Sequence, residues 1–281
     1  MILKLHNRTI KTSKPAFVMG IVNANNDSFW ENSRGGVDRA LQLIDEGADI
    51  IDIGSESTRP GAKYIDEQTE MSLLIPVIQE IRKHSSCPIS VDTRKASVMK
   101  VAFENGADIL NDVSALEDDI NMGPFAASVN IPVILMHKKG NPVIMQKDTT
   151  YQNVFSEVNN YLLSRAEKAI SLGIKKENII IDPGIGFGKN LESNLILIKR
   201  IGELCNGQYK ILMALSRKTC IGELTDKKVE DRLSGTLCAD IYSVLHGASI
   251  IRVHDVAETV DTMKVLEGIL NAWIWNFIKD L

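Results

Sequence analysis

Short apolar runs rich in β-branched residues recur along the whole chain. Each run ends beside a polar residue, and a stretch with helical spacing of apolar positions follows it. The runs occupy residues 17–22, 49–54, 88–91, 107–110, 132–136, 178–181, 210–215 and 248–253. Because such largely apolar runs are typical of strands buried on both faces of a parallel sheet, the pattern predicts eight parallel strands.

The stretches between the runs predict amphipathic helices. The clearest patterns cover residues 37–47, 70–83, 96–106 and 191–204. Several of them end in glycine, which suits a helix C-cap, and the linkers EGAD, ENGAD and HGAS mark similar helix-to-strand junctions. Pro76 interrupts the second pattern and predicts a kink or a shifted helix boundary.

Alternating strand and helix units of this number predict a single (β/α)8 TIM barrel over residues 1–281. A doubly wound open sheet is the alternative, and it is less favoured because no glycine-rich dinucleotide turn follows the first run. Residues 2–11 predict a short hairpin that caps the bottom of the barrel, with Asn7 and Arg8 in its turn.

Composition excludes several classes of protein. Hydrophobic residues make up 44% of the 281 and charged residues 24%, which excludes a disordered chain or a disulfide-dense scaffold. The net charge is −4 and the basic residues are scattered, so we expect no nucleic-acid partner. The four cysteines form no CxxC pair, and no apolar run approaches the roughly 20 residues that span a bilayer. We therefore expect a cytoplasmic protein without a membrane partner.

Candidate chemistry lies just beyond the predicted strands, since the carboxyl ends of barrel strands form one mouth. The polar residues at these positions are Asn23, Glu56, Thr58, Arg59, Asp92, Arg94, Asn111, Asp112, His137, Asp182, Ser216, Arg217, Lys218, Arg252 and His254. Taken singly, each is more often a rim residue paired with a neighbour. Their convergence from most of the strands favours a functional mouth.

Two chemical sets can be separated at this mouth. Carboxylate and amide acceptors suited to the N–H edge of a heterocycle are Asp92, Asn111 and Asp182. A cationic set suited to phosphate or carboxylate consists of Arg59, Lys218, Arg252 and His254. Together they indicate a planar polar ligand with an anionic tail.

The segment DPGIGFGK, residues 182–189, matches neither phosphate-binding glycine motif. Lys189 stands where a dinucleotide fingerprint needs its third glycine, and Pro183 stands where a P-loop needs glycine. We expect its backbone to bend closely round a ligand, with Phe187 as a stacking surface. No histidine spacing indicates a metal held by protein alone, which leaves open a hard cation recruited with substrate phosphates.

Eight blocks carry a family resemblance in chain order. They are MGIVNANNDSF (19–29), DIGSESTRPGA (52–62), SVDTRK (90–95), NDVSAL (111–116), ILMHKKGNPVIMQ (134–146), DPGIGFGKNLESN (182–194), LSRK (215–218) and RVHD (252–255). Together they resemble the dihydropteroate synthase family over essentially the whole chain. The resemblance implies condensation of 6-hydroxymethyl-7,8-dihydropterin pyrophosphate with 4-aminobenzoate, releasing pyrophosphate and giving 7,8-dihydropteroate, with Mg2+ as cofactor.

The resemblance also implies roles for individual residues. The pterin is assigned to Asp92, Asn111, Asp182 and Lys218, with Arg252 over its ring and Met136 and Phe187 lining the pocket. The pyrophosphate is assigned to Thr58, Arg59, Arg252, His254 and Asn23, the last together with Mg2+. Ser216 and the first two loops are assigned to the aminobenzoate. Independently of the resemblance, the long first loop without periodicity predicts a lid, whose Asp27 can approach the metal once pyrophosphate is bound. The catalytic set is therefore Asp92, Lys218, Arg252, His254 and Asp27.

Departures from the family pattern define the alternatives. The first loop usually reads N-V-T-P-D-S-F, whereas Asn25 and Asn26 replace Thr and Pro here. The alternative that the chain is an inactive pterin-binding paralogue rests on this change alone. A methyltetrahydrofolate-binding barrel that serves a corrinoid protein would share the acidic site but would not need the LSRK and RVHD cations. We expect altered affinity rather than lost activity.

The last predicted helix carries more apolar positions than one core-facing stripe requires. They are Val265, Leu266, Ile269, Leu270, Trp273, Ile274, Trp275, Phe277 and Ile278. This excess predicts a homodimer, and the family resemblance implies the same.

Overall fold

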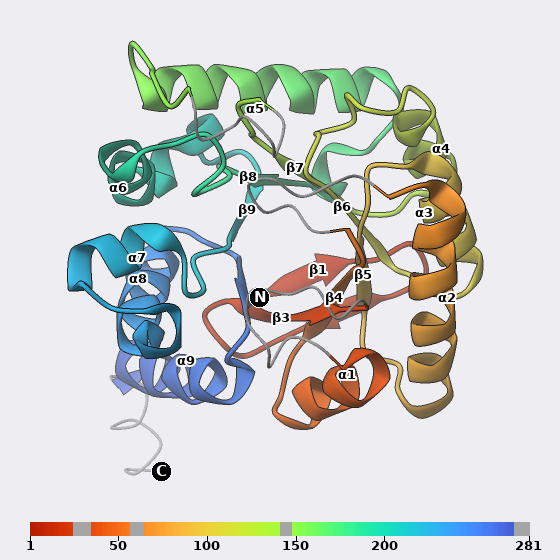
Figure 1. Ribbon diagram of the computed structural model, residues 1–281, viewed down its shortest axis with the longest axis horizontal. Coiled ribbons are helices and arrows are strands. Elements are labelled where there is room, and N and C mark those ends of the chain that lie inside the picture. The colour runs from red at the N-terminus through yellow and green to blue at the C-terminus, as the bar shows by residue number, and fades with distance from the viewer. Residues whose placement is uncertain (25–34, 57–64, 141–147, 273–281) are drawn as a thin grey trace, which may run out of the picture.

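Eight parallel strands close into a barrel (Figure 1). The computed structural model describes residues 1–24, 35–56, 65–140 and 148–272. Around the barrel the strands are β3 (Phe17–Asn23), β4 (Ile50–Gly54), β5 (Ile89–Asp92), β6 (Ile109–Asp112), β7 (Val133–Met136), β8 (Ile179–Asp182), β9 (Lys210–Met213) and β10 (Ile250–Val253), and β10 pairs with β3. The predicted (β/α)8 barrel is confirmed, and the open-sheet alternative is wrong because the last strand pairs with the first.

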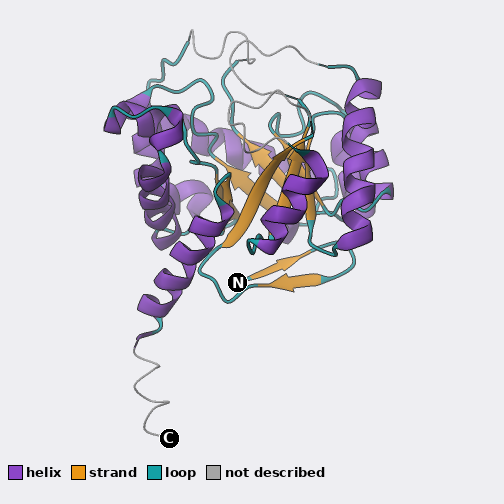
Figure 2. Ribbon diagram, turned by 60° about the horizontal axis from the view of Figure 1, so that its bottom comes forward, coloured by secondary structure: helices purple, strands orange, loops and turns teal. Residues whose placement is uncertain are grey.

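Helices cover the outside of the barrel (Figures 1 and 2). They are α1 (Gly36–Asp45), α2 (Glu67–His84), α3 (Ala96–Glu104), α4 (Met122–Val129), α5 (Val154–Ser171), α6 (Leu191–Lys199), α7 (Thr219–Thr225), α8 (Leu233–Leu245) and α9 (Val256–Leu270). The predicted glycine ends are confirmed where the chain must turn left-handed, since φ is 99° at Gly47 and 109° at Gly247. Helix α2 continues through Pro76, so a boundary at this residue is wrong.

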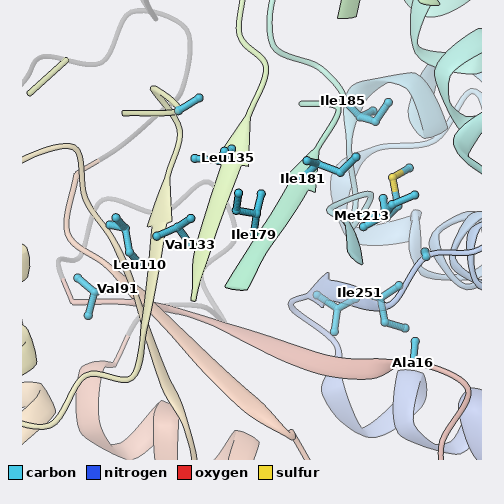
Figure 3. Packing of buried hydrophobic residues seen from close by; sticks show 14 of the residues in the cluster. Ala16, Val91, Leu110, Val133, Leu135, Ile179, Ile181, Ile185, Met213 and Ile251 are labelled. Atoms are coloured by element: carbon cyan, nitrogen blue, oxygen red, sulfur yellow. The ribbon is translucent and has the colours of Figure 1, made fainter. Parts of the chain in front are cut away.

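The strands alternate between two apolar layers. One set of side chains packs outward against the helices, and Figure 3 shows Val91, Leu110, Val133, Ile181 and Ile251 among them. The other set fills the lower interior of the barrel and consists of Phe17, Met19, Ile50, Ile109, Ile134, Ile180, Leu212, Ala214 and Ile250. Both sets are buried, which explains why the runs read as apolar throughout.

A two-stranded hairpin closes the bottom of the barrel (Figure 2). Strands β1 (Ile2–Lys4) and β2 (Thr9–Lys11) pair antiparallel, and Leu5 N–H donates to Arg8 O across the turn at 2.7 Å. Leu3 and Leu5 pack against the interior layer, and each buried leucine contributes about 1.5–3 kcal/mol of hydrophobic stabilisation. The predicted hairpin is confirmed. Among the described residues no helix is long and apolar enough to cross a bilayer.

Candidate active site

The interior face of the barrel changes from apolar to polar toward the carboxyl ends of the strands. Two residues beyond the interior isoleucines of β4, β6, β8 and β10 stand Asp52, Asn111, Asp182 and Arg252. Strand β5 contributes Asp92, which pairs in register with Asn111 on β6. Because alternate residues of a strand face the same side, these polar groups converge on the mouth.

Arg252 joins two carboxylates at the centre of this layer. Its Nε donates to Asp52 Oδ2 at 2.6 Å and its Nη2 donates to Asp92 Oδ2 at 3.3 Å. Asn111 Nδ2 also donates to Asp52 Oδ2, at 3.1 Å. Asp52 is fully buried, so Arg252 compensates a charge that is inaccessible to water. The predicted residues Asp92, Asn111 and Arg252 thus lie together.

The Asp92 carboxyl is a weaker acid than an exposed aspartate because it is buried beside a second carboxyl group. Burial and the charge of Asp52 raise the pKa of Asp92 to about 8, although Arg252 opposes the shift. This shift favours the protonated form of Asp92 in the ligand-free protein. Ligand N–H groups that donate to its oxygens would favour the ionised form.

Asp182 and Lys218 supply an acceptor and a donor on the opposite side of the layer. Asp182 Oδ1 accepts from Gly184 N–H at 2.7 Å, and burial raises its pKa while the Lys218 charge opposes this. Lys218 Nζ donates to Ile185 O and lies 5.1 Å from the centroid of the Phe187 ring. Burial lowers the pKa of Lys218 to about 8, against the effect of Asp182. The expected neighbours Asp182, Phe187 and Lys218 are therefore in one place.

Ser216 and His254 form a buried pair beside Arg252. Ser216 Oγ lies 2.8 Å from His254 Nδ1 and accepts from His254 N–H at 3.1 Å. Burial, followed by the charges of Arg252 and Arg217, lowers the pKa of His254 to about 3. The sequence placed His254 in the cationic set, whereas burial among guanidinium groups favours the neutral imidazole.

Several predicted rim residues form ion pairs or hydrogen bonds with residues of neighbouring loops. Arg94 Nη2 bonds Glu56 at 2.8 Å, and Glu56 Oε1 accepts from Ile65 N–H at 3.0 Å. Arg217 bonds both oxygens of Asp255 at 2.8 Å. Asp112 accepts from the Ser114 and Leu116 N–H groups. These residues brace the mouth and do not form part of its acceptor layer.

The loop after β8 is held by a buried lysine. Lys189 Nζ bonds His137 Nδ1 at 2.9 Å, Gly184 O at 2.9 Å and Phe187 O at 3.0 Å. Burial lowers the pKa of Lys189 to about 7. Gly184 has φ 64°, and a Cβ there would meet His137 O at 1.9 Å. The glycine is therefore required by the neighbouring loop, whereas the sequence predicted a close approach to a ligand.

The structure describes some of the remaining predicted site residues but not all of them. Asn23 is half-buried at the end of β3, and Met136 is buried at the end of β7. Asp27, Thr58 and Arg59 lie outside the described residues. Within the described ranges no three acidic, histidine or cysteine side chains gather as a metal site. The Asn23 amide oxygen is a hard donor of the kind that Mg2+ accepts alongside water and substrate phosphates.

Three residues that contact the site were missed by the sequence analysis. Asp52 had a usable signal, because an acid at an inward position of an apolar strand needs a buried partner. Lys189 was considered only as a mismatch to known glycine motifs. Arg39 of α1, whose Nη2 donates to His254 O at 2.7 Å, had no signal, since 215 residues separate the two.

Comparisons with known proteins agree with this geometry. Residues 19–254 match the family described as pterin binding enzyme. The dihydropteroate synthase of Haemophilus influenzae is 41% identical over 277 residues, covering 97% of this chain and 100% of that protein. The Yersinia pestis dihydropteroate synthase, solved with a sulfonamide drug complex, superposes with a TM-score of 0.90 at 36% identity, covering 96% of this chain and 100% of that one. The Xanthomonas albilineans dihydropteroate synthase with 4-aminobenzoic acid superposes with a TM-score of 0.87 at 38% sequence identity. This superposition covers 96% of this chain and 98% of that one.

Proposed function

This chain belongs to the dihydropteroate synthase family of pterin-binding enzymes, and we propose that it condenses 6-hydroxymethyl-7,8-dihydropterin pyrophosphate with 4-aminobenzoate. The products are 7,8-dihydropteroate and pyrophosphate. The enzyme is a transferase, and the relatives do not favour a corrinoid-linked methyltransferase or an inactive paralogue.

The observation that carries this proposal is the Asp52–Arg252–Asp92 group within a layer of amide and carboxyl acceptors. A pterin presents amino and ring N–H donors along one edge, which Asp92, Asn111 and Asp182 can accept. Lys218 complements an acceptor atom of the same ring, and Phe187 and Met136 offer apolar surface to its faces. A purely apolar ligand would leave these buried polar groups without partners.

The chemistry follows from where charge develops. Loss of pyrophosphate leaves a cation delocalised over the pterin, and the ionised Asp92 carboxylate stabilises it. Arg252, which bonds this carboxylate, would hold the departing anion together with Thr58, Arg59 and the neutral His254. No enzyme group attacks the pterin carbon. The neutral arylamine nitrogen forms the new C–N bond with the cation after the C–O bond to pyrophosphate has broken, and it then loses one N–H proton to the released pyrophosphate or to water, so a covalent enzyme intermediate is not needed.

Mg2+ is part of the proposal because the leaving group is a polyanion. Asn23 and Asp27 would hold it, with the remaining positions taken by water and phosphate oxygens. When bound, the ion neutralises part of the charge on the leaving pyrophosphate.

An assay for pyrophosphate release tests the function directly. We expect release only when both the pterin pyrophosphate and 4-aminobenzoate are present, and we expect excess EDTA to suppress it until Mg2+ is restored. Binding of the pterin without release would favour the inactive paralogue. Methyl transfer from methyltetrahydrofolate to a corrinoid, without any pyrophosphate release, would overturn the assignment.

We further propose a homodimer that buries the outer faces of α8 and α9. The exposed fractions are 53% for Leu245, 64% for Val265, 66% for Ile269 and 54% for Leu270, and the two helices pack together. We expect light scattering to give twice 31.1 kDa for the wild type and a monomer for Ile269→Glu. Ile170→Glu on α5, where the native side chain is 41% exposed, is the matched control and should remain dimeric. A wild-type monomer at micromolar concentration would contradict the proposal.

A further inference from the structure

The hydrogen bonds between Ser216 and His254 carry information about where the imidazole proton lies. Both residues are 4% exposed. Ser216 Oγ accepts the His254 backbone N–H at 3.1 Å and lies 2.8 Å from Nδ1 of the same residue. One hydroxyl therefore contacts the main chain and the ring of His254 together.

Hydrogen-bond accounting fixes the direction of the second contact. A serine hydroxyl has one proton and two lone pairs, and here one lone pair already accepts the His254 N–H. Within the described chain the acceptor that the hydroxyl proton reaches is His254 Nδ1. If Nδ1 carried a proton instead, the hydroxyl proton would be buried without a described acceptor, which is costly. A neutral ring that accepts at Nδ1 carries its proton on Nε2.

Nearby cations favour the neutral imidazole of His254, and two hydrogen bonds hold the backbone of this residue. The cationic groups that act on it are Arg252, Arg217, Arg39 and Lys218, which come from β10, α1 and the loop after β9. Arg39 Nη2 also donates to His254 O at 2.7 Å, so both backbone polar groups of His254 are bonded. A ring held in this way changes neither its orientation nor its charge easily.

We propose that Ser216 is a positioning residue that holds His254 as the neutral Nε2–H tautomer, which donates to a pyrophosphate oxygen. The donor part rests on the proposed function, whereas the tautomer part rests only on the contacts above. A neutral donor complements the nearby arginines, because it supplies a directed hydrogen bond without adding a further buried positive charge. This assigns Ser216 to the leaving-group side of the site, whereas the family resemblance assigns it to the aminobenzoate.

Nitrogen NMR of histidine-labelled, ligand-free protein measures the tautomer. The chain has five histidines, and the His254 signals are those that disappear in His254→Gln. We expect a protonated Nε2 and an unprotonated Nδ1 in the wild type, a mixture of tautomers in Ser216→Ala, and the wild-type pattern in Ser216→Thr, which keeps the hydroxyl. A protonated Nδ1 in the wild type overturns the proposal even if neither Ser216 variant folds.

Kinetics and a ligand probe test the donor part. We expect Ser216→Ala to lower kcat/KM for the pterin pyrophosphate about tenfold, while KM for 4-aminobenzoate stays unchanged. Inorganic pyrophosphate should shift the His254 Nε2 signal in the wild type. An unshifted signal, or a change confined to KM for 4-aminobenzoate, overturns the donor role.

Ser243→Ala is the matched control. Ser243 is equally buried on α8, and its hydroxyl donates to Ala239 O of the same helix at 2.8 Å. Its removal should leave the His254 tautomer and both kinetic constants unchanged. If the wild type releases no pyrophosphate, the proposed function fails, and the ligand-free spectrum still decides the tautomer.

Discussion

Asp92→Asn should lower kcat by about 10²- to 10³-fold while the barrel remains folded. Asparagine keeps the size of the side chain and one acceptor oxygen, but it cannot carry the charge that faces the developing pterin cation. Because this interaction strengthens only in the transition state, the loss should appear in kcat more than in KM. Steady-state pyrophosphate release with circular dichroism of the variant measures both, and a near-normal kcat would exclude the stabilising role of the charge.

The same substitution should stabilise the fold at high pH. The folded-state pKa of Asp92 is about 8, above the ordinary value near 3.9, so folding binds a proton between these limits. The stability contributed by the protonated carboxyl is fully present below pH 4 and is lost as pH rises through 8. Asp92→Asn escapes this loss, so its Tm should exceed that of the wild type more at pH 9 than at pH 5. An equal difference at both pH values would contradict the raised pKa.

Removing Arg252 should damage both stability and activity. Arg252→Leu leaves the fully buried Asp52 without a cation and deletes the proposed pyrophosphate contact. Breaking a buried ion pair by removing one partner costs about 3–5 kcal/mol, which denaturant unfolding can measure. Turnover should fall below detection even under conditions where the variant is folded.

A second variant separates the two effects of Arg252. In Asp52→Asn/Arg252→Leu the unpaired buried charge is gone, so much of the lost unfolding free energy should return. Activity should not return, because the cation is still absent. Recovery of neither quantity would indicate that Arg252 acts through packing and not through charge compensation.

The barrel could be predicted because a parallel strand buried on both faces leaves a simple apolar signal. The position of Asp92, Asn111, Asp182 and Arg252 followed from the rule that strand ends share one mouth. Asp52 was also within reach, since it lies two residues after the inward-facing Ile50. Asp52 lies within strand β4 and not at its end, so the rule for strand ends did not include it.

The charge states of the site residues and their contacts with neighbouring loops could not be predicted in the same way. The neutral state of His254 depends on burial and on charges from α1, β10 and the loop after β9, which come together only in the folded chain. The Arg39 contact to His254 and the Lys189 contact to His137 join distant positions without any local pattern. The sequence therefore indicated which residue types line the mouth, but not which of them contact neighbouring loops.

Pairing of β3 with β10 has a consequence for synthesis of the chain. Phe17 pairs in register with Ile250, and Asp52 forms its ion pair with Arg252, which lies 200 positions later in the chain. A nascent chain that lacks the last strand therefore presents two open sheet edges and an uncompensated acid in its interior. Ribosomal pauses or nonsense codons before residue 250 should yield aggregation-prone fragments without partial activity, and chaperone demand should end only when the final strand and helix emerge.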